Sequence, residues 1–159
     1  MSALTKTLGV AAVSAAVAGA AIWWLTGTDS QAVVLRPNDP QTVAAGAAIY
    51  ARECASCHGA NLQGEPNWQS RGPDGLLPAP PHDETGHTWH HPDELLFRLT
   101  KEGVAEVAGL EGYKTNMPAY EARLSDEEIV AALSYIKAQW PPEVRRRHDE
   151  MNRRAGGGR

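Results

Sequence analysis

Residues 54–58 read Cys54-Ala55-Ser56-Cys57-His58, two cysteines and a histidine in the order C-x-x-C-H. On a helix, positions i, i+3 and i+4 lie on one face, so the two thiols and the imidazole share a surface. This spacing is typical of c-type haem attachment, in which the thiols bond to the porphyrin vinyl groups and the histidine reaches the iron. We therefore predict one covalently attached haem c, with Cys54 and Cys57 as its attachment points and His58 as the proximal iron ligand.

Other uses of the two cysteines fit the sequence less well. The chain has only two cysteines, which excludes a zinc site made of four. A zinc site of two cysteines and two histidines would need His87 and His91, which lie too far along the chain for finger-like spacing. A thioredoxin-type C-x-x-C would follow a strand in a β-α-β pattern, and the sequence has no strand–helix alternation. A simple disulfide does not require the adjacent histidine.

Met117 is the predicted second iron ligand. Of the three methionines, Met1 begins the chain and Met151 lies near its end, whereas Met117 precedes Pro118. Proline disfavours helical geometry in the residue before it, so Met117 is expected in an extended loop. A His/Met pair raises the reduction potential relative to His/His and closes the iron to small ligands. The competing ligands, which are also candidates for a second metal site, are His82, His87, His90 and His91.

Three main helices are predicted around this motif. The first spans about 40–53 and begins after Asp39, a residue type that caps helix N-termini. The second spans about 92–102 and begins with a proline followed by acidic residues. The third spans about 126–139 and follows a capping box that starts at Ser125. Each has apolar residues at helical spacing, which indicates one buried face.

A long Gly- and Pro-rich loop is predicted between the first two helices, from Gly64 to Pro81. Such a loop is uncommon inside a compact domain unless it packs on something. The chain also contains a single Phe, so its apolar core is thin. We expect the haem to supply both the surface for the loop and the missing part of the core.

Composition and charge exclude several classes of protein. Hydrophobic residues are 42% and charged residues 21%, which is typical of globular material. Residues 29–140 form one domain's length and carry eight Lys or Arg against sixteen Asp or Glu. This acidic balance argues against a nucleic-acid partner, which needs a basic surface. No catalytic triad, phosphate-binding loop or paired catalytic carboxylates are visible, so we expect an electron-transfer protein rather than an enzyme.

The N-terminal segment, residues 1–28, is expected to direct the chain out of the cytoplasm. Residues 7–26 carry no charge, and a helix of this length reaches ~30 Å, about one hydrocarbon core. Trp23 and Trp24 lie near the end of this run. Aromatic side chains of this kind prefer the membrane interface, which is where the end of a spanning helix would lie. We favour a retained signal-anchor helix, and the alternative is a signal peptide cleaved after Ala20.

Three further segments complete the expected organisation. Residues 29–38 are expected to be a linker and residues 39–140 the haem-binding domain. Residues 141–159 carry six arginines and are expected to be a disordered basic tail.

Taken together, the motif at 54–58, the downstream Met117-Pro118 and the three helices resemble the class I (monohaem) cytochrome c family, over about residues 39–140. The resemblance implies an all-α, cytochrome c-like fold wrapped around one haem. It implies that the first and last helices cross at a glycine beside aromatic side chains, and the matching residues here are Gly46, Tyr50 and Tyr135. It also implies that a proline carbonyl accepts the N–H of the proximal histidine, and the candidates are Pro78, Pro80 and Pro81.

The chain looks most like membrane-anchored bacterial cytochromes that face the periplasm. On that resemblance we expect a one-electron carrier in a respiratory or other redox chain, on the periplasmic side of the inner membrane. The expected partners are redox proteins in or at the membrane, with the N-terminal helix as the membrane contact. Two alternatives stay open: a haem subunit of a membrane oxidoreductase complex, and a ligand-binding haem enzyme or sensor with a labile Met117.

Overall fold

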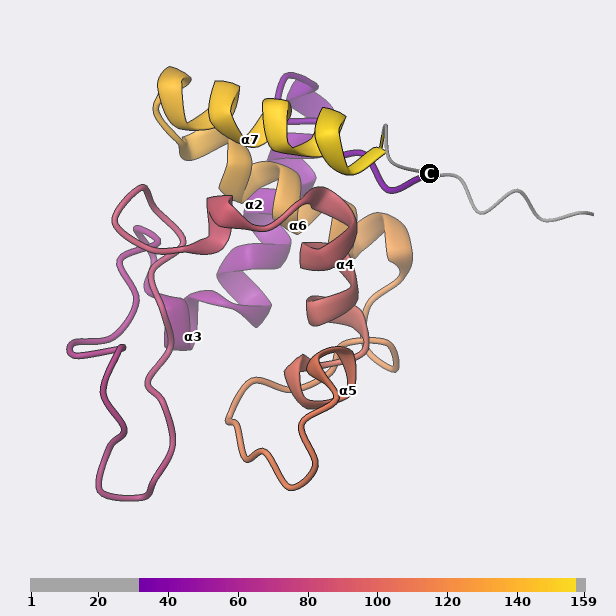
Figure 1. The fold of residues 1–159 in the computed structure, drawn as a ribbon. Coiled ribbons are helices and arrows are strands. Elements are labelled where there is room, and N and C mark those ends of the chain that lie inside the picture. The colour runs from indigo at the N-terminus through magenta and orange to yellow at the C-terminus, as the bar shows by residue number, and fades with distance from the viewer. Residues whose placement is uncertain (1–31, 157–159) are drawn as a thin grey trace, which may run out of the picture. The chain divides into compact units, whose positions relative to one another are not determined.

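Helices account for all the regular secondary structure of residues 32–156, the part of the chain that the computed structural model describes (Figure 1). This part contains no β-strand, so the predicted all-α fold class is confirmed for it. The elements are α2 (Pro40–Glu53), α3 (Ala55–His58), the 3-10 turn η1 (Thr88–His90), α4 (Asp93–Lys101), α5 (Val104–Ala108), α6 (Asp126–Gln139) and α7 (Pro142–Gly156).

The first and third predicted helices begin and end at the expected residues, as α2 and α6. The Asp39 carboxylate accepts a hydrogen bond from the Gln41 backbone N–H at 3.1 Å. At the start of α6, the Ser125 hydroxyl accepts from the Glu128 backbone N–H at 3.3 Å, and the Glu128 carboxylate accepts in return from the Ser125 N–H at 2.9 Å. These caps satisfy amide groups that the first turn of a helix leaves without partners, which is why local sequence predicts both starts.

The helices α2 and α6 pack against each other. Gly46, Ile49 and Tyr50 are buried on α2, and the Tyr50 ring lies 5.4 Å from the Tyr135 ring of α6, centroid to centroid. The expected crossing at a glycine beside two aromatic side chains is therefore present. The second predicted helix, 92–102, is α4, which begins one residue later because Pro92 is its N-cap. A short helix that the sequence did not predict, α5, follows it directly.

The prediction of a disordered tail over 141–159 is wrong for residues 142–156, which form helix α7. Pro142 begins this helix, as proline often does. Val144 and His148, one turn apart, are buried and pack against the domain, where His148 contacts the Trp140 ring. The arginines of this segment indicate a solvated tail, whereas the buried stripe at helical spacing is narrow and one of its two members is a histidine.

A polar network, which we call the Asp93 cluster (Asp93, Lys137, His148, Asp149 and Asn152), fastens α7 to α4 and α6. Asp93, Lys137 and His148 are buried, whereas Asp149 is exposed. The Lys137 ammonium lies 2.7 Å from the Asp149 carboxylate and 3.6 Å from that of Asp93. The Asn152 amide donates to Asp93 at 3.0 Å, and its oxygen accepts from the Asp93 N–H at 2.8 Å. Charged groups buried in this way need partners, and this cluster supplies them.

The segment before α2 joins the same cluster. Leu35 is buried and its N–H donates to the Asp93 carboxylate at 2.9 Å, while the Arg36 N–H donates to the Ser134 hydroxyl at 2.9 Å. The linker expected over 29–38 is therefore wrong for residues 33–36, which belong to the domain. The predicted signal-anchor or signal peptide, residues 1–28, lies outside the described residues. Among residues 32–156, no helix is long and apolar enough to cross a membrane.

Candidate haem-binding site

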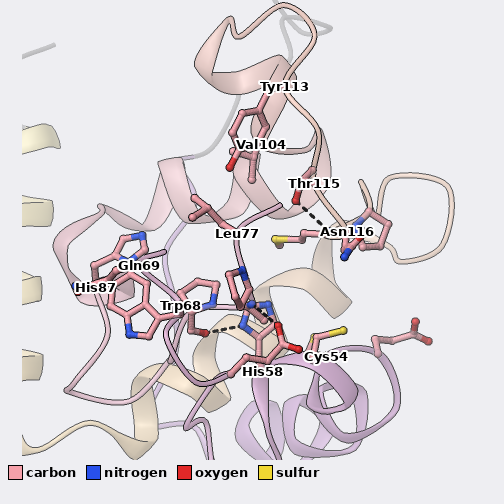
Figure 2. Close-up of a pocket in the computed structure, with 18 of the residues that line it drawn as sticks. Cys54, His58, Trp68, Gln69, Leu77, His87, Val104, Tyr113, Thr115 and Asn116 are labelled. Atoms are coloured by element: carbon pink, nitrogen blue, oxygen red, sulfur yellow. Dashed lines mark hydrogen bonds between the residues drawn. The ribbon is translucent and has the colours of Figure 1, made fainter. Parts of the chain in front are cut away.

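A cavity of about 520 Å³ lies between the C-x-x-C-H turn, the 64–81 loop and the segment that follows α5 (Figure 2). Its volume is within the range of about 300–1,000 Å³ that is usual for ligand and cofactor pockets. Figure 2 shows Cys54 and His58 on one side of this cavity and Thr115 and Asn116 on the other. The four predicted haem-binding residues, Cys54, Cys57, His58 and Met117, all line it.

His58 is buried and one of its ring nitrogens is already engaged. Its Nδ1 lies 2.8 Å from the Pro80 carbonyl oxygen, and the N–H donates to that acceptor. Pro80 is therefore the proline that meets the expectation, rather than Pro78 or Pro81. This hydrogen bond leaves the lone pair on Nε2, which is the arrangement found in metal-ligating histidines. Burial lowers the pKa of His58, against a smaller opposing effect of the Pro80 hydrogen bond, so the ring is neutral at pH 7.

The two cysteines are free thiols, not a disulfide. Cys57 is exposed and Cys54 is half-buried. Desolvation, with a smaller contribution from the Glu53 carboxylate, raises the pKa of Cys54 to about 11. Nucleophilic and redox-active cysteines have lowered pKa values, so Cys54 lacks the properties of a catalytic thiol. Two thiols on the rim of a cofactor-sized cavity fit the covalent role that their spacing predicts.

Met117 comes to the cavity on a loop between α5 and α6. It is half-buried, and its N–H donates to the Thr115 hydroxyl at 3.1 Å. Two residues after Pro118, the Tyr120 hydroxyl donates to the Glu53 carbonyl oxygen at 2.9 Å. This contact fastens the methionine loop to the end of α2, next to the cysteines.

The long loop predicted from Gly64 to Pro81 is present, and it forms another wall of the cavity. Trp68 and Leu77 of this loop line the cavity, together with Tyr113 from the loop before Met117. The Arg71 guanidinium lies 5.9 Å from the centre of the Tyr113 ring, so the two loops are in contact beside the cavity. Sequence reasoning missed these residues, because a Gly- and Pro-rich composition predicts a loop but not which side chains face inward.

The four histidines proposed as competing ligands do not form a metal-holding group within residues 32–156. His82 stacks on His58 with their ring centroids 3.9 Å apart, and its pKa is lowered well below the usual value by desolvation. His87 also lines the cavity, where it stacks on Trp68 and lies edge-on to the His91 ring. His90 and His91 do not line it: His90 stacks on Trp89, and the His91 carbonyl accepts from the His148 ring. Residues 32–156 contain no group of three or more His, Cys, Asp or Glu side chains that would hold a metal ion, so the second metal site has no support.

The residues of this cavity fit a c-type haem, with two thiols for the porphyrin, a neutral imidazole with one free nitrogen and a thioether. The cytochrome c family model matches residues 43–140, which is more than half of the chain and contains every one of these donors. Neither a curated protein nor a solved structure matches the chain. Members of the family carry covalent haem c and typically act as electron carriers rather than enzymes. From the length of the match we conclude that the chain belongs to the cytochrome c family.

Proposed function

We propose that the protein is a one-electron carrier with a single haem c, attached through Cys54 and Cys57 and ligated by His58 and Met117. The main support for the proposal is that these four side chains line one cavity, although Met117 lies far from the motif in sequence. When bound, the haem supplies an iron that gains and loses one electron without any bond to a substrate.

His58 is proposed to be the proximal ligand because its surroundings prepare it for that role. The Pro80 carbonyl, 2.8 Å away, holds the ring proton at Nδ1 and thereby selects the tautomer with a free Nε2. Burial lowers the pKa of the ring, so protons do not compete for that nitrogen near neutral pH. The hydrogen bond also limits how far the ring rotates, which keeps Nε2 aimed in one direction.

Met117 is proposed to complete the ligand set from the opposite wall. Its loop is tied to α2 by the Tyr120–Glu53 hydrogen bond, and the Met117 N–H donates to the Thr115 hydroxyl. These contacts hold the methionine loop beside the cavity that Met117 lines. Compared with a pair of histidines, a histidine and a methionine raise the reduction potential of the iron, and they also exclude small ligands. Both properties suit an electron carrier.

The proposed setting is the periplasmic side of a bacterial inner membrane, with redox proteins in or at the membrane as partners. Support for export and anchoring comes from the uncharged run of residues 7–26. Support for electron exchange at a surface comes from Cys57 and Leu77, which line the cavity and are exposed, with Leu77 at 38%. A haem held by these residues would be accessible to a redox partner without any opening of the fold.

Intact mass of the purified, exported protein is the first test. We expect the mass of the chain plus one haem, and the same spectrum reports whether the segment ending at Ala20 has been removed. Replacement of both cysteines, Cys54→Ser with Cys57→Ser, should abolish the adduct, whereas Ser56→Ala, between them, should retain it. A wild-type mass without a haem adduct would overturn the proposal.

The ferric absorption spectrum is the second test. A Met–iron charge-transfer band, together with no CO binding by the reduced protein, is expected for a carrier. Rapid CO binding to the wild type would favour the alternative of a ligand-binding haem enzyme or sensor, in which Met117 is labile.

A further inference from the structure

We propose that His82 is a positioning residue that sets the plane of the His58 imidazole. The proposal rests on the proposed function, since it concerns His58 as an iron ligand. It goes beyond that function, because neither ligation nor the hydrogen bond to Pro80 requires an aromatic residue at position 82. The sequence offered His82 only as a rival ligand.

The two imidazoles lie face to face. Their centroids are 3.9 Å apart and their planes differ by 22°, so the two rings are stacked. Rotation of a histidine ring about its outer side-chain bond is otherwise soft, because that torsion has broad minima. The hydrogen bond to Pro80 fixes one edge of the His58 ring, and the stacked His82 ring blocks rotation about that edge. Together, the two contacts leave the ring one orientation.

His82 is itself held at three points. Its ring Nδ1 lies 2.7 Å from the hydroxyl of Thr88, which is buried. Its backbone N–H donates to the Leu62 carbonyl at 2.7 Å, and its own carbonyl accepts from the Trp140 indole N–H at 2.7 Å. A side chain held in this way provides a rigid surface rather than one that moves with its neighbour.

Both constraints on His58 come from one short stretch of chain. The Pro80 carbonyl supplies the hydrogen bond and His82, two residues later, supplies the stacked ring. This stretch is where the long loop ends, so its position depends on the loop packing correctly. Residues around a metal ligand that fix its orientation tune the properties of the metal. A flat ring at position 82 therefore contributes to the electronic state of the site without touching the metal.

The test is proton NMR and electron paramagnetic resonance of the ferric holoprotein. The spread of the haem methyl shifts and the anisotropy of the g-tensor both report the plane of the axial imidazole. We expect His82→Leu, which keeps bulk but removes the flat ring, to change both. His82→Phe restores a flat ring at this position and should return both toward wild type. His90→Leu is the matched control, because His90 stacks on Trp89 at 3.6 Å, does not line the cavity and should change neither.

A second variant covers the case in which His82→Leu does not fold. Thr88→Val keeps the His82 ring but removes the hydroxyl that holds it, and should give an intermediate change in both spectra. A folded His82→Leu or Thr88→Val protein with the wild-type pattern would overturn the proposal. Failure of the proposed function is separately visible, since the wild type itself would then lack the haem adduct or the His/Met spectrum.

Discussion

The α-carbon of Gly46 on α2 faces the backbone carbonyl of Ala131 on α6, so closely that a methyl group at position 46 would overlap the carbonyl oxygen. The same methyl group would lie 2.9 Å from the β-carbon of Tyr135. Two helices approach this closely only where one of them lacks a side chain, which explains a glycine in the middle of α2 despite its cost to helix stability.

Gly46→Ala should therefore destabilise the domain, although alanine is the better helix former. We expect a loss of about 1–3 kcal/mol in the free energy of unfolding, the usual cost of forcing an extra methyl group into a packed interface. Denaturant titration of the holoprotein measures it. Ala48→Ser adds one atom to an exposed position of the same helix, and should cost about 0.5 kcal/mol. Equal losses in the two variants would show that the close approach is unimportant.

Met117→Ala should open the sixth coordination position and lower the reduction potential, because a thioether opposite a histidine stabilises the reduced state. The expected observations are loss of the Met–iron band, CO binding by the reduced variant and a lower midpoint in a redox titration. Met151→Ala removes a methionine of α7 that does not line the cavity, and should leave all three unchanged. An unchanged Met117→Ala spectrum would reassign the ligand to His87, which among the four rival histidines is the one that lines the cavity.

Lys137→Met should weaken the attachment of α7. Lys137 is only 3% exposed, and without its ammonium the buried Asp93 loses a cationic partner. Breaking a buried pair by removing one member leaves the other charge uncompensated, so we expect a loss of about 3 kcal/mol in the free energy of unfolding. Lys101→Met removes a pair in which Asp126 is 63% exposed, and should cost less than about 1 kcal/mol. Comparable losses would show that the Asp93 cluster does not stabilise the fold.

Stability should fall as the pH is lowered from 7 to 5, partly because of His148. Burial, and then the nearby Lys137 ammonium, lower the pKa of His148, against the smaller opposing effects of the His91 carbonyl hydrogen bond and of the Asp93 and Asp149 carboxylates. The unfolded chain then binds a proton at a pH where the folded chain does not, so this contribution is complete above about pH 6.5 and is lost below it. The slope is at most about 1.4 kcal/mol per pH unit for one such group.

The measurement is the free energy of unfolding at several pH values, by denaturant titration. His148→Gln keeps a donor for the His91 carbonyl but cannot be protonated, so its slope should be shallower than that of the wild type. His90→Gln replaces an exposed histidine and serves as the control. A wild-type slope in His148→Gln would exclude the proposed role of His148.

Local sequence was sufficient for the helices whose ends carry their own signals. Asp39 and Ser125 cap the helices that follow them through hydrogen bonds within three residues, so neither depends on the rest of the fold. The sequence also predicts haem attachment at the C-x-x-C-H motif, because the groups involved lie within five consecutive residues. By contrast, α7 has a polar composition and is stabilised by contacts with distant residues, so its sequence alone suggested disorder.

Residue order alone established that two thiols and an imidazole share one helical face, and that a methionine follows next to a proline. The folded chain was needed to show that Pro80, rather than Pro78 or Pro81, meets His58, and that His82 stacks on His58 instead of competing with it. The difference lies in distance along the chain. Spacing within one helical turn fixes which side chains are neighbours, whereas the path of a long loop depends on what it packs against.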